Sequence, residues 1–455
     1  MADDVAAPLP LPRLEELVAA GEVDTVVVCF TDMQGRLQGK RLHAAYFLSD
    51  VLEHGTEGCN YLLAVDIDMN TVAGYEISSW SRGYGDMEFV LDISTLRITP
   101  WLPGTAMVQC DLAWLDDEHS PVVQSPRTIL RTQAERAAAH GFKAYAGTEL
   151  EFNIYNNTYE DAWDKGYLNL TPGNQYNVDY SLLGTSRVEP LLRDIRNQMY
   201  AAGLTPESAK GECNLGQHEI AFKYEDILRA ADQHVVYKNA AKEIASQHGK
   251  AITFMAKFDE REGNSCHVHM SLRGRDDAVV FDEGEGPTET FEHFVAGIQA
   301  TLYDFTLLYA PNINSYKRFA EGSFAPTAIA WGRDNRTCAL RVVGHGSGLR
   351  VENRLPGGDM NPYLGLAGML AGGLHGIENE LTLEPAFQGN AYQSDKRHVP
   401  RTLSEARDAF SASQVARSTF GDAVVDHYLN AADVELAAFN AAVTDWERFR
   451  SFERM

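Results

Sequence analysis

The sequence lacks several features that would assign it to a common class of protein. Its six cysteines form no Cys-X-X-Cys pair, and it has no Gly-X4-Gly-Lys-Ser/Thr segment, so it is not a P-loop enzyme. Its longest apolar run, residues 363–377, is too short and too rich in glycine to span a bilayer, and we expect it to form a tightly packed internal helix. We expect reduced thiols in a cytoplasmic protein with no membrane partner.

Positive charge is scarce as well. Lys and Arg number 39 against 64 Asp and Glu, which gives a formal net charge of −25. Nucleic acids and anionic membrane surfaces need a basic footprint on their partner, so neither is expected to bind. The excess of carboxylates is compatible with bound divalent cations. The acidic, proline-rich stretch 1–12 is typical of neither a secretory signal nor a transit peptide.

Apolar patterning indicates two regions. In the first, up to about residue 112, a short helix at 13–21 is followed by short strand-like runs, which predict a small sheet. These runs are 24–32, 36–42, 61–68, 87–93 and 105–112. After a polar stretch at 116–127, strands alternate with long helices. The helices are 125–141, 189–203 and 225–249, and the last 55 residues are also helical. The predicted class is α+β or α/β with a large mixed sheet, divided into domains 1–112 and 113–455.

Charged side chains with a two-residue spacing indicate a possible site. Glu149 and Glu151 lie two apart in a predicted strand, so both leave the same face, where they repel unless a cation neutralises them. His267 and His269 share the same spacing. A single pair of either kind is more often an ordinary surface or core feature than a ligand set.

The combination of such pieces is more specific than any one of them. Glu212 and Glu219 flank a turn-like segment, and Arg350, Glu352 and Arg354 alternate along a further stretch. Five acids with a histidine pair suit Mg²⁺ or Mn²⁺ rather than structural zinc. The arginines around them are Arg318, Arg336, Arg341, Arg350 and Arg354. Guanidinium groups match phosphate and carboxylate, so the set is typical of metal-assisted phosphoryl transfer.

Six ordered motifs resemble those of a known family, the type I glutamine synthetases. They are GTELEF (147–152), GECNLGQHE (211–219), FMAKF with GNSCHVHMSL (254–272), NINSYKRF (312–319), NRTCALRV (335–342) and RVENRLPGGDMNPY (350–363). FTDMQGRLQGKR (30–41) extends the resemblance over nearly the whole chain. The resemblance implies an N-terminal β-grasp domain and a large catalytic domain. It also implies a dodecamer of two six-membered rings, with active sites between neighbouring subunits.

The resemblance further implies ligands for two metal ions. The ion beside the acid substrate would be held by Glu151, Glu212 and Glu219. The ion on the ATP phosphates would be held by Glu149, His267 and Glu352. Two or three Mg²⁺ or Mn²⁺ ions per active site are therefore expected, with ATP as co-substrate.

Substrate-binding positions follow from the same resemblance. Nucleotide-binding positions match His269, Ser271 and Arg350. Glutamate-binding positions match Gly263, Arg318 and Arg354. Arg336 and Arg341 match positions that meet the transferring phosphate of ATP. In the family reaction ATP phosphorylates the γ-carboxylate of glutamate, and a nitrogen nucleophile then displaces phosphate in a site closed to water.

Two positions depart from the pattern of the family members that use ammonia. Phe324 stands where those members have an acid that helps to bind and deprotonate ammonium, and the nearest acid, Glu321, aligns there only after a local shift. Cys59 stands where they have an aspartate that faces the neighbouring subunit's site, with Glu57 and Asn60 as alternative alignments.

These departures favour an organic amine, such as ethanolamine or a polyamine, as the acceptor. Capture of ammonium needs carboxylates, because a cation stripped of water without a counter-charge is costly. A phenyl ring instead suits an amine that carries carbon. The alternatives are an ordinary glutamine synthetase in which Phe324 only packs, and a non-catalytic member, which would be expected to lose its metal ligands. Tyr392 lies near a tyrosine that the family adenylylates, but its flanks differ, and we expect an ordinary surface residue.

Overall fold

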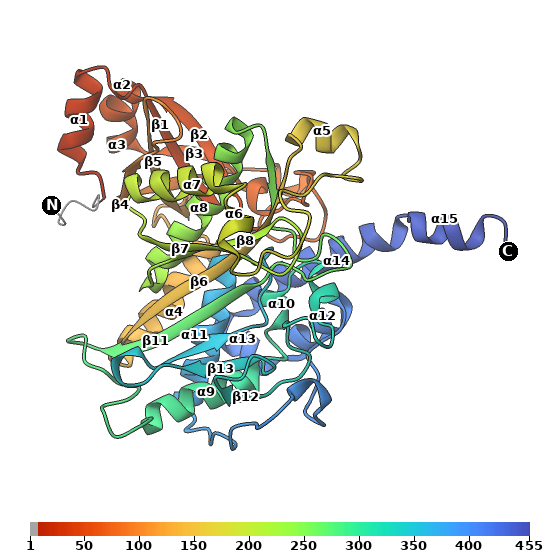
Figure 1. The fold of residues 1–455 in the computed structure, drawn as a ribbon. Helices are drawn as coiled ribbons and strands as arrows, with labels where there is room; N and C mark the ends of the chain where they lie inside the picture. Colours follow the sequence, from red (N-terminus) through yellow and green to blue (C-terminus); the bar gives the residue numbers. More distant parts are fainter. Residues whose placement is uncertain (1–7) are drawn as a thin grey trace.

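Two β-sheets, each built from a different part of the chain, organise the protein (Figure 1). The computed structural model describes residues 8–455. Most of the stretch 1–12, which we expect to be neither a secretory signal nor a transit peptide, lies outside the described residues. The α+β class predicted from the sequence is confirmed.

The N-terminal sheet has five strands in the order β2-β1-β5-β4-β3. Strand β1 pairs antiparallel with β2 and parallel with β5, and the other pairs are antiparallel. The strands are β1 (Thr25–Thr31), β2 (Leu37–His43), β3 (Thr56–Cys59), β4 (Asp86–Ile98) and β5 (Thr105–Trp114). The helices are α1 (Leu11–Ala19) and the single turns α2 (Ala44–Tyr46) and α3 (Leu52–His54).

One strand prediction in this region is wrong. Residues 61–68 form no strand, and a 3₁₀ turn occupies Asn60–Leu63 instead. The side chain of Asn60 donates to the carbonyl oxygen of Ile77, and the carboxylate of Asp66 accepts from the backbone N–H groups of Asp68 and Asn70. The bonds of Asp66 are local, and such bonds offer the backbone an alternative to a strand ladder.

The second sheet has nine strands and forms the centre of the molecule. Its main path runs β12-β13-β14-β11-β6-β8-β7, while β9 and β10 also pair with β6. The strands are β6 (Phe142–Tyr155), β7 (Pro206–Gly211), β8 (Gln217–Phe222), β9 (Glu225–Asp226), β10 (Ala251–Thr253), β11 (Cys266–Gly274), β12 (Trp331–Arg333), β13 (Leu340–Val343) and β14 (Arg350–Asn353). Only β12 and β13 pair in parallel among the pairs along that path.

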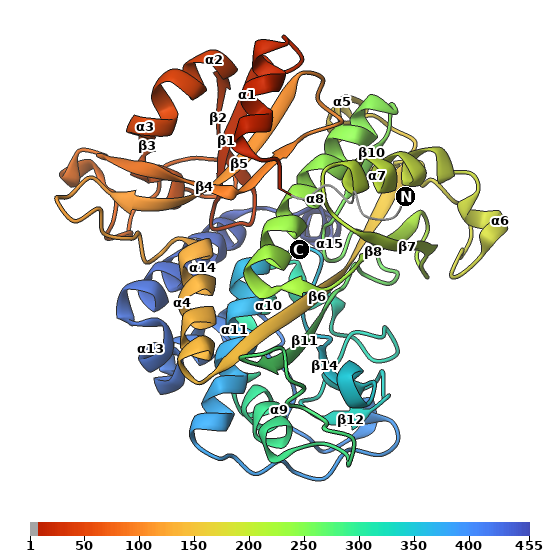
Figure 2. The same cartoon turned by 90° about the vertical axis from the view of Figure 1, so that its left-hand side faces the viewer.

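Helices cover one face of this sheet and leave the other for chemistry (Figure 2). Along β6, Ala144, Ala146, Leu150 and Phe152 are buried, because alternate residues of a strand share a face and these meet α4 and α8. The helices are α4 (Pro126–Ala139), α5 (Tyr159–Asp164), α6 (Leu182–Thr185), α7 (Glu189–Ala201), α8 (Ile227–Gln247), α9 (Glu289–Thr301), α10 (Thr306–Tyr309), α11 (Pro362–Glu378), α12 (Leu403–Ala412), α13 (Gln414–Phe420), α14 (Asp422–Ala441) and α15 (Asp445–Ser451).

Helix α11 confirms the expected internal helix. It packs against α4 and α9, and almost every residue in it is buried. A Cβ added at Gly376 would lie 2.0 Å from the carbonyl oxygen of His293, so the close approach of α9 and α11 requires glycine there. Within residues 8–455, no helix combines the length and the apolar character needed to cross a membrane. All six cysteines are free, as predicted.

A buried ion network joins the N-terminal sheet to helices of the catalytic region. Arg127, at the start of α4, donates to Asp92 of β4, to Asp111 of β5 and to Asp232 of α8, at 2.6 to 2.9 Å. The side chain of Asn361 also reaches across and donates to the carbonyl oxygens of Asp32 and Met33. Polar contacts therefore tie the N-terminal region to α4, α8 and the start of α11.

Candidate active site

One face of the central sheet brings the predicted ligands into a row. Strand register places Glu151 of β6 directly opposite Glu219 of β8, and Glu149 of β6 directly opposite His267 of β11. His269 of β11 lies opposite Glu352 of β14. These side chains share a face because each strand alternates in and out, so the two-residue spacing in the sequence becomes a line of ligands in space.

Three carboxylates form the first predicted metal group. Oxygen atoms of Glu151, Glu212 and Glu219 lie within 4.8 Å of one another, and Glu151 and Glu219 are buried. Oε2 of Glu151 accepts from the backbone N–H of Ser265 at 2.7 Å and from the side chain of Gln217 at 3.1 Å, which fixes its position. Carboxylates packed this closely repel one another, and a hard divalent cation with oxygen ligands relieves that repulsion. The donor set therefore fits Mg²⁺ or Mn²⁺.

Burial has a strong effect on Glu219. Removal from water, together with the negative charges of Glu149 and Glu151, raises the pKa of Glu219 to about 8, against the opposing effect of Lys210. Lys210 of β7 lies directly opposite Glu219 and forms ion pairs with Glu212 and with Glu219, the latter at 3.5 Å. An ammonium group therefore lies among the three carboxylates.

The second group contains two acids and two imidazoles. Ligand atoms of Glu149, His269 and Glu352 lie within 4.8 Å of one another. Nδ1 of His267, the predicted ligand, lies 3.1 Å from Glu149 and 3.6 Å from Glu352, and its Nε2 is buried with no hydrogen-bond partner among the described residues. An imidazole with one nitrogen close to two carboxylates and the other buried without a partner fits a metal ligand. Which imidazole binds stays a prediction.

Positive charges keep these two acids ionised. Burial would raise the pKa of Glu149, but hydrogen bonds from His267 and His269 hold it well below its usual value. Burial would also raise the pKa of Glu352, but the nearby His267 and Arg354 outweigh burial, so the pKa of Glu352 is lowered. Arg341 donates to Oε2 of Glu352 at 2.8 Å and to Asp334 at 3.0 Å, so it joins the row.

Arg318 and Gly263, predicted to hold glutamate, lie in contact. Arg318 is 1% exposed and donates to the carbonyl oxygen of Leu355 and to Oγ of Ser265, both at 2.9 Å, while its Nε has no partner among the described residues. A Cβ at Gly263 would lie 2.6 Å from Cγ of Arg318 and 2.3 Å from the carbonyl oxygen of Ala256. Only glycine lets this backbone approach the arginine so closely.

Phe324 lies on a loop that is tied to the same site. Its backbone has φ +58°, which a bulky residue seldom adopts, and its side chain is 55% exposed. Nη2 of Arg354 donates to the carbonyl oxygen of Phe324 at 3.3 Å, while Nη1 pairs with Glu352. Strained backbone of this kind persists where surrounding contacts hold it, often at functional sites.

The structure does not bring every predicted residue to this row. Arg336 is exposed, and its nearest acid, Asp334, is 4.0 Å away. Arg350 donates to Nδ1 of His269 at 3.2 Å, and Ser271 follows on the same face of β11. Cys59 ends β3, the outer strand of the N-terminal sheet, where its thiol faces the carbonyl oxygens of Tyr84 and Gly85.

Sequence reasoning overlooked several residues of the site. Lys210 stands two residues before Glu212 in the same alternation that identified the other ligands, and Gln217 precedes Glu219 by two. Both spacings were visible, but a lysine or an amide on a strand is normally a surface residue. Tyr392 was expected at the surface, yet its hydroxyl oxygen is buried, and burial raises its pKa.

Comparison with known proteins gives concordant results. The family described as "Glutamine synthetase, catalytic domain" matches residues 123–451. A γ-glutamylethanolamide synthetase from Streptomyces coelicolor is 63% identical over 452 residues, which cover 99% of this chain and 97% of that protein. A glutamate–isopropylamine ligase from a Pseudomonas species is 38% identical over 446 residues, which cover 96% and 97% of the two chains.

Solved structures agree on the fold. A complex of GmaS with ADP superposes with a TM-score of 0.84 at 25% identity and covers 97% of this chain and 99% of that one. GmaS without ligand superposes with the same TM-score at 26% identity. The similarity extends over both sheets, because each comparison covers nearly the whole chain.

Proposed function

The chain belongs to the glutamine synthetase family, and we propose that this member joins the γ-carboxyl group of glutamate to ethanolamine at the expense of ATP. It is an ATP-dependent carbon–nitrogen ligase that acts on an organic amine. The finer assignment, ethanolamine rather than another amine, is supported by the 63% identity to a protein named for that product.

The reaction has two balanced steps. An oxygen of the γ-carboxylate attacks the γ-phosphorus of ATP, the bond to ADP breaks, and γ-glutamyl phosphate forms. The nitrogen of the amine then attacks the acyl carbon, the carbon–oxygen bond breaks, phosphate leaves, and the nitrogen loses a proton. Divalent ions, when bound, neutralise the two anions that must meet.

The residues of the row supply the rest. We assign Glu151, Glu212 and Glu219 to the ion beside glutamate. Glu149 and Glu352, with His267 or His269, are assigned to the ion beside the nucleotide. The nucleotide itself is assigned to His269, Ser271 and Arg350, and glutamate to Gly263, Arg318 and Arg354. Arg341 and Arg336 are assigned to the transferring phosphate, because guanidinium groups bind phosphate oxygens bidentately.

The single observation that carries the choice of acceptor is Phe324. A half-exposed phenyl ring stands on the loop that Arg354 ties to Glu352, where ammonia-using members have an acid. A ring at this place offers an apolar wall to the carbon chain of an amine and no counter-charge to ammonium. The second departure, Cys59, removes another acid from the predicted acceptor site.

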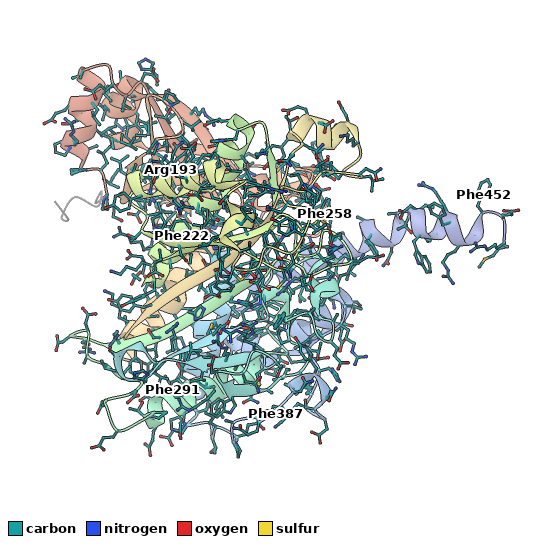
Figure 3. The ribbon with its side chains drawn as sticks, in the orientation of Figure 1. Arg193, Phe222, Phe258, Phe291, Phe387 and Phe452 are labelled. Atoms are coloured by element: carbon teal, nitrogen blue, oxygen red, sulfur yellow. The ribbon has the colours of Figure 1, made fainter. Side chains whose placement is uncertain are left out.

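Cys59 also supports self-association. It lies at the outer edge of the N-terminal sheet, away from the ligand row of its own chain, so it would serve a neighbouring subunit. Helix α15 projects from the body, and Phe452 at its far end is 92% exposed (Figure 3). Trp446 and Phe449 on the same helix are exposed as well, and contiguous exposed apolar surface of this kind marks protein interfaces. We propose a dodecamer whose active sites are shared between neighbouring subunits. We further propose that each subunit consists of domains 1–112 and 113–455, and that the enzyme acts in the cytoplasm.

A phosphate-release assay tests the proposed function. Purified protein with ATP, Mg²⁺ and glutamate is given ammonium, ethanolamine, isopropylamine, putrescine or spermine in separate reactions. Turnover with ethanolamine well above that with ammonium is expected. Phe324→Glu should shift turnover toward ammonium, and Phe324→Leu, which keeps an apolar wall without a charge, should not.

Other outcomes have clear meanings. Strong turnover with ammonium alone would leave an ordinary glutamine synthetase in which Phe324 only packs. A clear preference for putrescine or spermine would keep the γ-glutamyl–amine reaction and reject ethanolamine. An unchanged acceptor profile in Phe324→Glu would remove this residue from the acceptor site.

A further inference from the structure

Lys210 is a cation on the ligand row that the proposed mechanism does not use. Its position is set by the β7–β8 pairing, which places it directly opposite Glu219. Its ammonium group pairs with Glu212 and lies 3.5 Å from Glu219. The same group lies 5.3 Å from the ring centre of Tyr180, the only aromatic ring near it among the described residues.

The Lys210 ammonium group and a divalent ion cannot occupy the cluster of three carboxylates at the same time. Both are positive, and both depend on Glu212 and Glu219. The backbone of Lys210 is held by the strand register, so the ammonium group can swing aside but cannot leave the region. The face of Tyr180 is the contact that the structure offers to the displaced cation.

We propose that Lys210 selects against acceptor amines that carry a second positive charge. The inference rests on the proposed γ-glutamyl–amine reaction, in which the acceptor must reach the acyl carbon next to the ion held by Glu151, Glu212 and Glu219. The second ammonium group of a diamine would then lie close to the Lys210 ammonium group. A neutral hydroxyl at the same place meets no repulsion and can accept a hydrogen bond from the lysine.

An acid of opposite effect lies nearby. Asp179 is exposed, and its carboxylate accepts from the thiol of Cys213 at 3.6 Å and lies within 4.8 Å of a Glu212 oxygen. It would attract the second charge that Lys210 repels. Removing the charge of Lys210 and removing the charge of Asp179 should therefore change the preference for doubly charged acceptors in opposite directions. A purely structural role of either residue would not produce opposite changes.

The test compares two acceptors of equal length. Putrescine and 4-aminobutan-1-ol differ only in having an ammonium group or a hydroxyl at the far end. The ratio of kcat/KM for the alcohol to that for the diamine is measured in each protein. Because both values come from the same enzyme, changes in glutamate activation or metal content cancel in the ratio.

Lys210→Gln and Lys210→Met should lower this ratio about tenfold, since like charges a few ångströms apart in a partly buried site repel strongly. Lys210→Arg, which keeps the charge, should stay within about threefold of the wild type, and Asp179→Asn should raise the ratio. Mn²⁺ binding, followed by electron paramagnetic resonance without substrates, should tighten in Lys210→Met, because a competing cation is gone.

Three results would overturn the inference. An unchanged ratio in both neutral variants would show that the charge of Lys210 does not reach the acceptor. A ratio in Lys210→Arg as low as that in Lys210→Gln would assign the effect to shape. A wild-type enzyme that uses both acceptors equally overturns this inference alone, whereas no turnover with either acceptor overturns the proposed function as well.

Discussion

Arg354 donates from Nη2 to the carbonyl oxygen of Phe324 at 3.3 Å, and it pairs through Nη1 with Glu352. One buried guanidinium group thus connects the loop that carries the phenyl ring to Glu352, which we propose as a ligand of the second metal ion. Replacement of Arg354 should therefore affect both the position of the Phe324 loop and the charge balance of Glu352, because the same side chain contacts both.

Arg354→Lys is therefore expected to be severe. Lysine keeps the charge but cannot make two directed contacts from one planar group. We expect kcat/KM for glutamate to fall by roughly a hundredfold, which is about 2.7 kcal/mol of transition-state stabilisation. Steady-state kinetics with varied glutamate measures this. Activity within threefold of the wild type would show that Arg354 supplies only charge.

Glu219→Gln should weaken metal binding in the first group. It removes one of three carboxylates that lie within 4.8 Å of one another, and it leaves a neutral amide beside Lys210. We expect at least a tenfold loss of Mn²⁺ affinity at this site, since even outer-shell changes have effects of that size. Calorimetric titration measures the affinity. Glu207→Gln, which changes an exposed acid on the neighbouring strand β7, is the control and should bind as the wild type does.

Arg127→Leu should destabilise the fold without touching the site. Asp232 is buried and would lose its only arginine partner among the described residues. Leaving a buried carboxylate unpaired costs about 3 kcal/mol or more. Arg131→Leu, which removes a half-exposed partner of Asp111, should cost about 1 kcal/mol or less. Thermal unfolding of both variants gives the comparison, and equal effects would contradict the role assigned to Arg127.

His427 should make the protein sensitive to acid. Burial against Tyr75 lowers its pKa to about 3 in the folded chain, whereas an unfolded histidine titrates near 6.5. The unfolded chain therefore binds more protons between these values, and stability falls as the pH drops through that window.

The size of this effect can be measured by difference. From pH 7 to pH 5, His427 should cost about 2 kcal/mol per chain. His427→Gln should lose less stability over that range than the wild type, while His54→Gln, at an exposed position, should behave as the wild type. Denaturant unfolding at the two pH values measures the free energy of unfolding of each protein. An equal loss of that free energy in all three proteins would contradict the prediction.

Much of the site could be predicted from the sequence because strand geometry converts spacing into position. The period of two alone puts Glu149 and Glu151 on one face of β6, and His267 and His269 on one face of β11. The β6–β11 register that places His267 opposite Glu149 is a feature of the fold. The turn at 214–216 could be predicted from the sequence, but the grouping of Glu212 with Glu151 depends on the β6–β8 and β7–β8 pairings and was implied only by the family resemblance.

Other features depend on contacts that no local pattern reports. The left-handed backbone of Phe324 is held by Arg354, and Ser323 anchors the same loop to the carbonyl oxygens of Arg318 and Ala320. Residues 61–68 read as a strand because of their apolar run, but the side chains of Asn60 and Asp66 bond to nearby backbone and prevent it. The sequence analysis assigned no role to Lys210, because its position opposite Glu219 follows from the β7–β8 register.

The most direct measurement of the central claim is a competition. The protein is supplied with ATP, Mg²⁺, glutamate and equal concentrations of ethanolamine and ammonium, and the products are separated by mass spectrometry. We predict γ-glutamylethanolamide as the main product, with glutamine as a minor one. Glutamine as the main product would contradict the account, because the loop of Phe324 would then admit ammonium without the acid that this family uses for it.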